Sequence, residues 1–310
     1  MGEKCIICIG MTLLMLFLPY GLTMLMTGYD KQQGTIRDSG IIVEYEIAGE
    51  LKTADLEQYM IGVLLAELPY DYELAVYEAQ AVITRTNARK LHKAGTNFLA
   101  QDLKVSYATE EDMIKQLGQT RYEEQLKKVK TAIGNTYGMV LTYKGNYIDA
   151  LYHNVSMGQT ASALDVYGKD IPYLTSVDSS ADVEAKDYMQ TLTFTYEQLV
   201  ALLGDQYGLT PENFLAEVAI SEKSKAGYVK MVKLGTGNIT GEEFKQLLSL
   251  NSTYFYMESQ ENQLKIVCLG KGHGMGLSLY GANQMAKQGK DVRELLTYYY
   301  QGASVEVIGE

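Results

Sequence analysis

The 310-residue chain carries 38 acidic and 27 basic side chains, which give it a formal net charge of −11 at pH 7. This excess of negative charge argues against a nucleic-acid partner, which would require a basic face. With 46% apolar and 21% charged residues, the composition is that of a globular protein with a substantial core. The chain also has 25 tyrosines, a residue type suited to lining a groove for a sugar polymer.

The N-terminal region contains an uncharged run from Cys5 to Tyr29. This run is long enough to cross a bilayer, which takes about 20 apolar residues, and no A-x-A cleavage site follows it. We interpret residues 1–29 as an uncleaved single-pass anchor of the cell membrane with its N-terminus in the cytoplasm; a cleaved signal peptide is the alternative. Residues 30–40 are the expected linker to one extracytoplasmic domain at 41–310. Cys5 and Cys8 lie inside the apolar run, so their spacing does not predict a metal or redox site.

The stretch 59–90 predicts two helices that meet at a break, with Glu67 at the joint. Thr53 is the expected N-cap of the first helix, Pro69 ends that helix, and Asp71 is the expected N-cap of the second. The first helix has apolar residues at helical spacing, which are Leu56, Met60, Val63, Leu64 and Leu68.

Glu67 is the candidate catalytic residue of this stretch. The last turn of a helix carries a partial negative charge, and neighbouring leucines would exclude water; both effects favour a carboxyl group that keeps its proton near neutral pH. Such a group can donate a proton to a leaving group. The alternatives are a surface glutamate beside a helix end and an ion-pair partner of Arg85.

Short strands and helices alternate along the rest of the chain, which predicts an α+β fold with helices packed on mostly antiparallel strands. Residues 91–118 show no clear pattern. The expected elements are a strand at 41–48, a helix at 122–133, a hairpin at 138–149, a helix or strand-to-helix segment at 193–203, strands within 214–234, a capped helix at 240–248, strands at 253–257 and 264–269, and helices at 278–288 and 291–300.

Two segments outside the helices carry candidate binding residues. The polar segment 150–182 is long for a loop and holds His153. In the second segment, Gly270, Gly272, Gly274 and Gly276 alternate around His273, which predicts a tight turn that can approach a ligand closely. Its spacing matches neither the dinucleotide-binding nor the P-loop pattern.

Three separated stretches resemble the SpoIID/LytB family. They are AELP at 66–69 with EAQAVITRT at 78–86, YHNVSMGQTASALDVYGKDIPYLTSVDS at 152–179, and GHGMGLSLYGANQMAKQG at 272–289. Their order and separation match the family as well, and the resemblance covers roughly residues 43–310. The chain differs from the usual family pattern at positions expected in the cleft, which are Asn87, Asn154, Met157, Gln159 and Leu279.

The resemblance implies a membrane-anchored peptidoglycan lytic transglycosylase with Glu67 as acid and then base. The carboxyl group would protonate the glycosidic oxygen between MurNAc and GlcNAc, and then take the proton from the C6 hydroxyl of MurNAc, leaving a 1,6-anhydro end. Arg85 would orient Glu67 or bind a substrate carboxylate. The histidines would bond substrate polar groups or stabilise charge; otherwise they would fix their own loops. The expected substrate-binding residues are Arg85, His153, Ser156, Asp165, Tyr167, His273, Ser278 and Tyr280.

The partners implied are peptidoglycan glycan strands and, in a sporulation engulfment complex, a cell-wall amidase and a multi-span membrane protein. No metal or other cofactor is expected, because the second stretch offers one histidine and no cysteine. The main alternative function is a scaffold that grips peptidoglycan and stimulates an amidase. A further alternative is a two-carboxylate hydrolase that pairs Glu67 with Asp71 or Asp165.

Overall fold

The computed structural model describes residues 36–92, 97–203 and 205–308. The predicted anchor at 1–29 and most of the predicted linker lie outside this part of the chain. Within it, no helix has the length and apolar character needed to cross a bilayer. The fold of the described residues is α+β, and most of the strand pairs are antiparallel.

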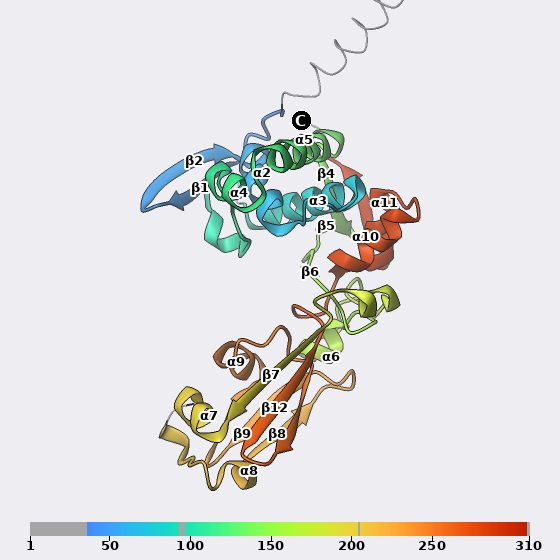
Figure 1. Ribbon diagram of the computed structural model, residues 1–310. Coiled ribbons are helices and arrows are strands. Elements are labelled where there is room, and N and C mark those ends of the chain that lie inside the picture. Colours follow the sequence, from blue (N-terminus) through green and yellow to red (C-terminus); the bar gives the residue numbers. More distant parts are fainter. Residues whose placement is uncertain (1–35, 93–96, 204, 309–310) are drawn as a thin grey trace, which may run out of the picture.

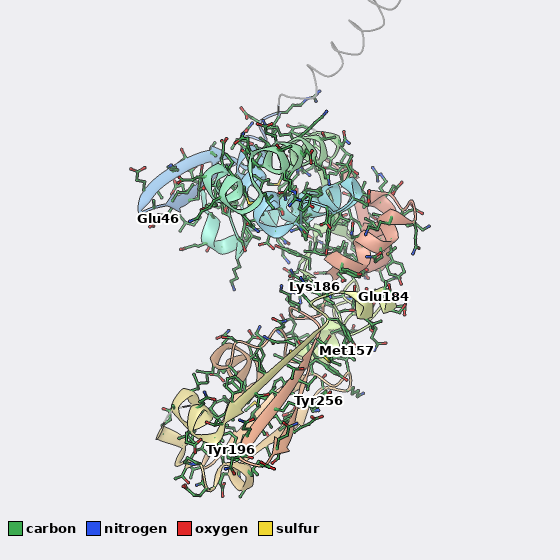
Figure 2. The ribbon with its side chains drawn as sticks, in the orientation of Figure 1. Glu46, Met157, Glu184, Lys186, Tyr196 and Tyr256 are labelled. Carbon is green, nitrogen blue, oxygen red and sulfur yellow. The ribbon has the colours of Figure 1, made fainter. Side chains whose placement is uncertain are left out.

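The described residues form two lobes, each with a hydrophobic core of its own (Figure 1). The first lobe comprises residues 36–188 and 270–308 and contains most of the helices. The second lobe comprises residues 189–269 and is mainly β-sheet. In Figure 2, Met157 and Lys186 lie where the lobes meet, whereas Glu46 lies at the far end of the first lobe. The sequence predicted one domain at 41–310 and did not distinguish these lobes.

The first lobe begins with a small sheet, ordered β2-β1-β3, that leads into two long helices. Its elements are β1 (Ile42–Ile47), β2 (Glu50–Asp55), β3 (Phe98–Leu99), α2 (Leu56–Glu67) and α3 (Leu74–Leu91). Thr53 is not the N-cap of α2, because β2 continues through it to Asp55, whose side chain accepts from the Glu57 N–H. Asp71 does not cap α3 either, since that helix begins after Glu73.

Residues 100–148 complete the N-terminal half of the first lobe. The segment without a clear sequence pattern forms a short 3-10 helix η1 (Ala100–Leu103) and α4 (Glu110–Leu117). The predicted helix at 122–133 is part of α5 (Gln119–Asn135), and the predicted hairpin is β4 (Met139–Tyr143) with β5 (Asn146–Tyr147). The strand β14 (Ser304–Val307) pairs with β4, so the first and the last described segments both contribute to this lobe.

The polar segment and the C-terminal helices meet in a two-stranded parallel pairing. Strand β6 (Tyr152–His153) pairs with β13 (Leu277–Ser278). After β6 the chain forms α6 (Ala163–Tyr167) and the 3-10 helix η2 (Ser180–Glu184). The predicted C-terminal helices are α10 (Leu279–Lys287) and α11 (Val292–Tyr299), which begin after N-caps Ser278 and Asp291.

The second lobe contains two three-stranded antiparallel sheets, ordered β10-β9-β8 and β11-β12-β7. The predicted capping box of Thr240 and Glu243 is present at the start of α9. The elements of this lobe are β7 (Met189–Thr195), α7 (Tyr196–Leu203), η3 (Asp205–Tyr207), α8 (Phe214–Glu217), β8 (Val218–Lys223), β9 (Val229–Leu234), β10 (Gly237–Thr240), α9 (Gly241–Leu247), β11 (Phe255–Gln260) and β12 (Gln263–Leu269).

Candidate functional site

Glu67 is the last residue of α2, and its side chain is half-buried. The backbone N–H of Ser106 donates a hydrogen bond of 2.7 Å to Glu67 Oε1. The segment that carries Ser106 is fixed along α2 by a second bond, from the Ala108 N–H to the Gly62 carbonyl at 3.0 Å. A backbone donor therefore holds the carboxylate in one orientation at the surface.

The leucines around Glu67 do not enclose it as the sequence predicted. Leu64 is fully buried, and Leu65 and Leu68 are 4% and 3% exposed, all in the core of the first lobe. Glu67 remains half-buried because the last turn of α2 directs the carboxylate away from these side chains and towards the segment around Ser106.

Tyr152 of β6 lies beside Glu67. Burial is the main cause that raises the pKa of the Tyr152 phenol, and the neighbouring Glu67 carboxylate raises that pKa further. The polar segment therefore reaches the end of α2 through this tyrosine. The sequence prediction missed Tyr152, although its position directly before His153 in the second family stretch was a usable signal.

The glycine-rich turn packs directly on β6. Gly276 has a φ of +69°, and a Cβ at this position would collide with the Leu151 carbonyl oxygen. A Cβ at Gly272, where φ is +106°, would lie 2.8 Å from the Cβ of His153. The tight turn was predicted, but at these two positions the close approach is to the polar segment of the chain itself, so their glycines serve to join the second and third family stretches.

Both histidines contact the backbone of Met275. His153 Nδ1 lies 3.1 Å from the Met275 carbonyl oxygen, which requires a proton on Nδ1. His273 Nδ1 accepts from the Met275 N–H at 3.1 Å, which places the proton of that ring on Nε2. The ring centroids are 5.9 Å apart. Met275 thus fixes a different tautomer for each histidine.

The two rings differ in exposure. His153 is 2% exposed, and its Nε2 has no hydrogen-bond partner among the described residues. Burial, and then the neighbouring His273, lower the pKa of His153 to about 3. Burial and Lys245 lower the pKa of His273 to about 4, against the opposing effects of Glu242 and the Tyr152 backbone. Both rings are therefore neutral at pH 7. His273 is half-buried and stays a candidate for substrate contact, whereas the contacts of His153 are those of a ring that fixes its own loop.

Two serines predicted to bind substrate are buried around Asp182 instead. Ser156 is 1% exposed, and its N–H donates to Asp182 Oδ2 at 2.7 Å. Ser278 is fully buried, and its hydroxyl donates to the same oxygen at 2.8 Å, while the Ser179 hydroxyl lies at 3.1 Å. Burial raises the pKa of Asp182, and its hydrogen bonds act against that rise. Because both serines bond the Asp182 carboxylate, they hold the polar segment against the start of α10.

The remaining polar candidates, which are Asp165, Tyr167 and Tyr280, differ in exposure and in their hydrogen bonds. Asp165 accepts from the Ser162 hydroxyl at 2.7 Å at the start of α6. Tyr167 is 56% exposed. Tyr280 is half-buried at the start of α10, with its N–H bonded to the Asn154 carbonyl at 3.0 Å. None of these three residues forms a hydrogen bond with Glu67 in the part of the chain that the structure describes, so their role in substrate binding stays a prediction.

Arg85 is not part of the site. Its side chain is fully buried, and it donates to both oxygens of Glu57, at 2.6 Å and 2.7 Å, and to the Met139 carbonyl at 3.1 Å. The predicted roles of orienting Glu67 or binding a substrate carboxylate are wrong, because the guanidinium is fully engaged in the core between α2, α3 and β4.

Two of the departures from the family pattern also lie away from the expected cleft. Leu279 is 1% exposed and belongs to the core of the first lobe. The Asn87 amide bonds both backbone groups of Ala150, each at 3.0 Å, and so fixes the chain two residues before β6. Within the described ranges, no group of three or more His, Cys, Asp or Glu side chains is placed to hold a metal ion.

Comparison with known proteins gives the family. The family model described as stage II sporulation protein matches residues 45–143. Stage II sporulation protein D of Bacillus subtilis (strain 168) is 33% identical over 258 residues, which cover 81% of this chain and 74% of that protein. The chain belongs to the SpoIID family. Stage II sporulation protein D of Bacillus amyloliquefaciens is 31% identical over 258 residues, which again cover 81% of this chain and 74% of that protein.

The chain is more distantly similar to the amidase enhancer of Bacillus subtilis (strain 168). It is 22% identical over 297 residues, which cover 79% of this chain and 40% of that protein. The resemblance predicted from the three stretches is thus confirmed. The matched range 45–143 contains Glu67 and Ser106 but ends before Tyr152, so the approach of Tyr152 to Glu67 brings the matched part of this SpoIID chain together with the polar segment.

Proposed function

We propose that this SpoIID-family chain is a peptidoglycan lytic transglycosylase that remodels the cell wall during sporulation, with Glu67 as its catalytic acid and base. The observation that supports this proposal most directly is the position of Glu67. It is half-buried at the end of α2, where the polar segment, joined to the glycine-rich turn, reaches it through Tyr152. A glycan strand could reach such a carboxyl, whereas Glu57, the buried carboxylate of α2, is paired with Arg85.

One carboxyl group is enough for the proposed reaction. Protonated Glu67 gives its proton to the glycosidic oxygen while positive charge develops at C1 of MurNAc. The carboxylate that results accepts the Ser106 N–H, and this bond stabilises its charge. It then removes the proton of the C6 hydroxyl, which closes onto C1. No second carboxylate is needed to activate water.

The location and partners of the protein are part of the proposal. Residues 1–29 would anchor the chain in the cell membrane and place residues 41–310 outside the cytoplasm. A cell-wall amidase and a multi-span membrane protein of an engulfment complex would act with it. The amidase enhancer among the relatives supports a link to an amidase, and it also favours the second candidate function, a peptidoglycan-binding scaffold that does not cleave.

Digestion of purified glycan strands, with and without stem peptides, tests the proposal. Mass spectrometry should find 1,6-anhydro-MurNAc ends with the wild-type protein. We expect Glu67→Gln to lower their formation at least about 100-fold, because it removes the proton donor and keeps the shape. Glu124→Gln, at an exposed position of α5, is the matched control and should keep full activity. Glycan binding without any product would instead support the scaffold, and new reducing ends would support a hydrolase.

A further inference from the structure

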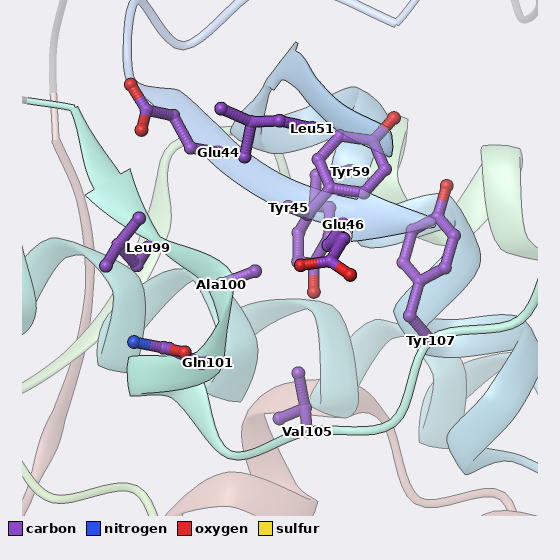
Figure 3. Close-up of a pocket in the computed structure, with 10 residues that line it drawn as sticks. All are labelled: Glu44, Tyr45, Glu46, Leu51, Tyr59, Leu99, Ala100, Gln101, Val105 and Tyr107. Atoms are coloured by element: carbon purple, nitrogen blue, oxygen red, sulfur yellow. The ribbon is translucent and has the colours of Figure 1, made fainter. Parts of the chain in front are cut away.

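A pocket of about 330 Å³ lies in the first lobe, beside the segment that carries Ser106 (Figure 3). Its walls come from β1, β2, α2, β3, η1 and the segment before α4. None of the residues predicted to bind or cleave a substrate lines it. The pocket is therefore a second concave feature that the proposed reaction does not use.

Three tyrosines form one wall of the pocket. The ring centroids of Tyr45, Tyr59 and Tyr107 are 5.1 to 5.3 Å apart, and the rings of Tyr59 and Tyr107 are stacked. Tyr107 packs directly on Gly62 of α2, where a Cβ would collide with its ring. Burial raises the pKa of Tyr59 to about 12, so its phenol is neutral at physiological pH. The wall is aromatic, and accessible aromatic ring faces attract cations.

The charged groups of the pocket are both acidic. Glu44 accepts from the Asn97 amide at 2.7 Å, and Glu46 is exposed and forms no ion pair within the described residues. In Figure 3 the Glu46 carboxylate lies in the middle of the lining side chains. No lysine or arginine is among the described lining residues. An anionic ligand would be repelled here, whereas a cation would meet carboxylates and ring faces together.

Apart from the tyrosines and the two glutamates, the lining is apolar except for the Gln101 amide. Leu99 and Val105 face the tyrosines across the pocket, and Leu51 lies at its edge with 69% exposure. The apolar side chains can cover an aliphatic stem. A ligand that fits both halves of the pocket therefore has one cationic end and an aliphatic stem.

We propose that this pocket binds the side chain of a diamino acid in a peptide, with its ammonium group against Glu46 and the tyrosine rings and its methylene groups against Leu99 and Val105. The segment that carries Val105 and Tyr107 also carries Ser106, whose N–H holds Glu67. If the substrate is peptidoglycan, as proposed above, the peptide is a stem peptide with a free amine; only this choice of source rests on the proposed function.

Saturation-transfer NMR of the full-length protein in detergent micelles tests binding without any cleavage step. The probe is Nα-acetyl-L-lysine methylamide, and its neutral counterpart is the same compound acetylated at Nε. We expect the charged probe to bind at least about 5-fold more tightly than the neutral one, with an affinity that falls as salt rises. Equal affinity for both probes, or no binding of the charged probe, would overturn the proposal.

Two variants of the same hairpin locate the binding site. We expect Glu46→Gln to weaken binding of the charged probe about 5-fold and to remove most of its salt dependence. Glu50→Gln removes the same charge from an exposed position of β2 that does not line the pocket, and it should leave the affinity unchanged. Equal effects of the two variants would refute the assigned site. A stem peptide that binds no better than the free probe would contradict the assigned source.

Discussion

Buried His153 makes the stability of the protein depend on pH in a calculable way. Its pKa in the folded protein is about 3, below the value of 6.5 for an exposed histidine, because the ring is buried beside His273. The folded state thus binds fewer protons than the unfolded chain. The stability contributed by the neutral ring is fully present above pH 6.5 and is lost as the pH falls towards 3.

The size of this loss of stability follows from the pKa of a histidine in the unfolded chain. A pH of 5 is about 1.5 units below the pKa of a histidine in the unfolded chain, and each unit corresponds to about 1.4 kcal/mol. Lowering the pH from 8 to 5 should therefore reduce the free energy of unfolding by about 2 kcal/mol through His153. His153→Asn is the informative variant. It cannot titrate, and its side-chain amide can still donate to the Met275 carbonyl in place of Nδ1.

Urea unfolding of both proteins at several pH values between 8 and 5 measures this effect. The pKa of His273 is also lowered, and that of Asp182 is raised, which acts in the opposite direction; both groups are present in both proteins, so their contributions cancel in the difference. We expect the wild type to lose about 2 kcal/mol more than His153→Asn. Parallel curves over this range would refute the argument that His153 is held neutral by burial.

Three further predictions concern the core of the first lobe, the glycine-rich turn and Tyr152. Arg85→Met should cost about 3–5 kcal/mol of unfolding free energy, because it leaves Glu57 buried without its partner; a urea midpoint close to wild type would contradict this. Gly276→Ala should lower the free energy of unfolding by more than about 2 kcal/mol, because φ is positive and the new Cβ would collide with a carbonyl oxygen. Gly289 also has a positive φ but open space around it, so thermal unfolding should show a clearly smaller loss of stability for Gly289→Ala. Tyr152→Phe should lower kcat for glycan cleavage about 10-fold with little change in KM, and equal activity would show that the phenol hydroxyl has no part in the reaction.

The elements that the sequence predicted correctly are set by neighbouring residues. The capping box of Thr240 and Glu243 and the hairpin turn at Lys144 and Gly145 each depend on a few consecutive residues, and both occur as expected. The N-cap of α2 was placed two residues early because Thr and Asp are both good caps. The choice between them depends on how far β2 pairs with β1, which is a contact between separate segments.

The errors at the site arise from contacts that local patterns do not reveal. Arg85 and Glu57 are 28 positions apart, and only the packing of α3 against α2 brings them together. Ser156 and Ser278 looked like groove residues because polar loop residues usually face solvent, but both bond to buried Asp182. By contrast, the three family stretches indicated correctly which segments come together, since the end of α2, β6 and the glycine-rich turn are adjacent in the structure.

The sheet-rich second lobe leaves and rejoins the rest of the chain at one place. Met189 and Leu269 are paired across β7 and β12, and just outside them the Gly270 N–H bonds the Tyr188 carbonyl at 2.7 Å. A short hairpin turn could therefore bridge the two attachment points in place of the whole lobe, with little added cost in loop-closure entropy. The carboxylate at the end of α2 would keep its backbone donor in such a shortened chain, because Ser106 belongs to the first lobe.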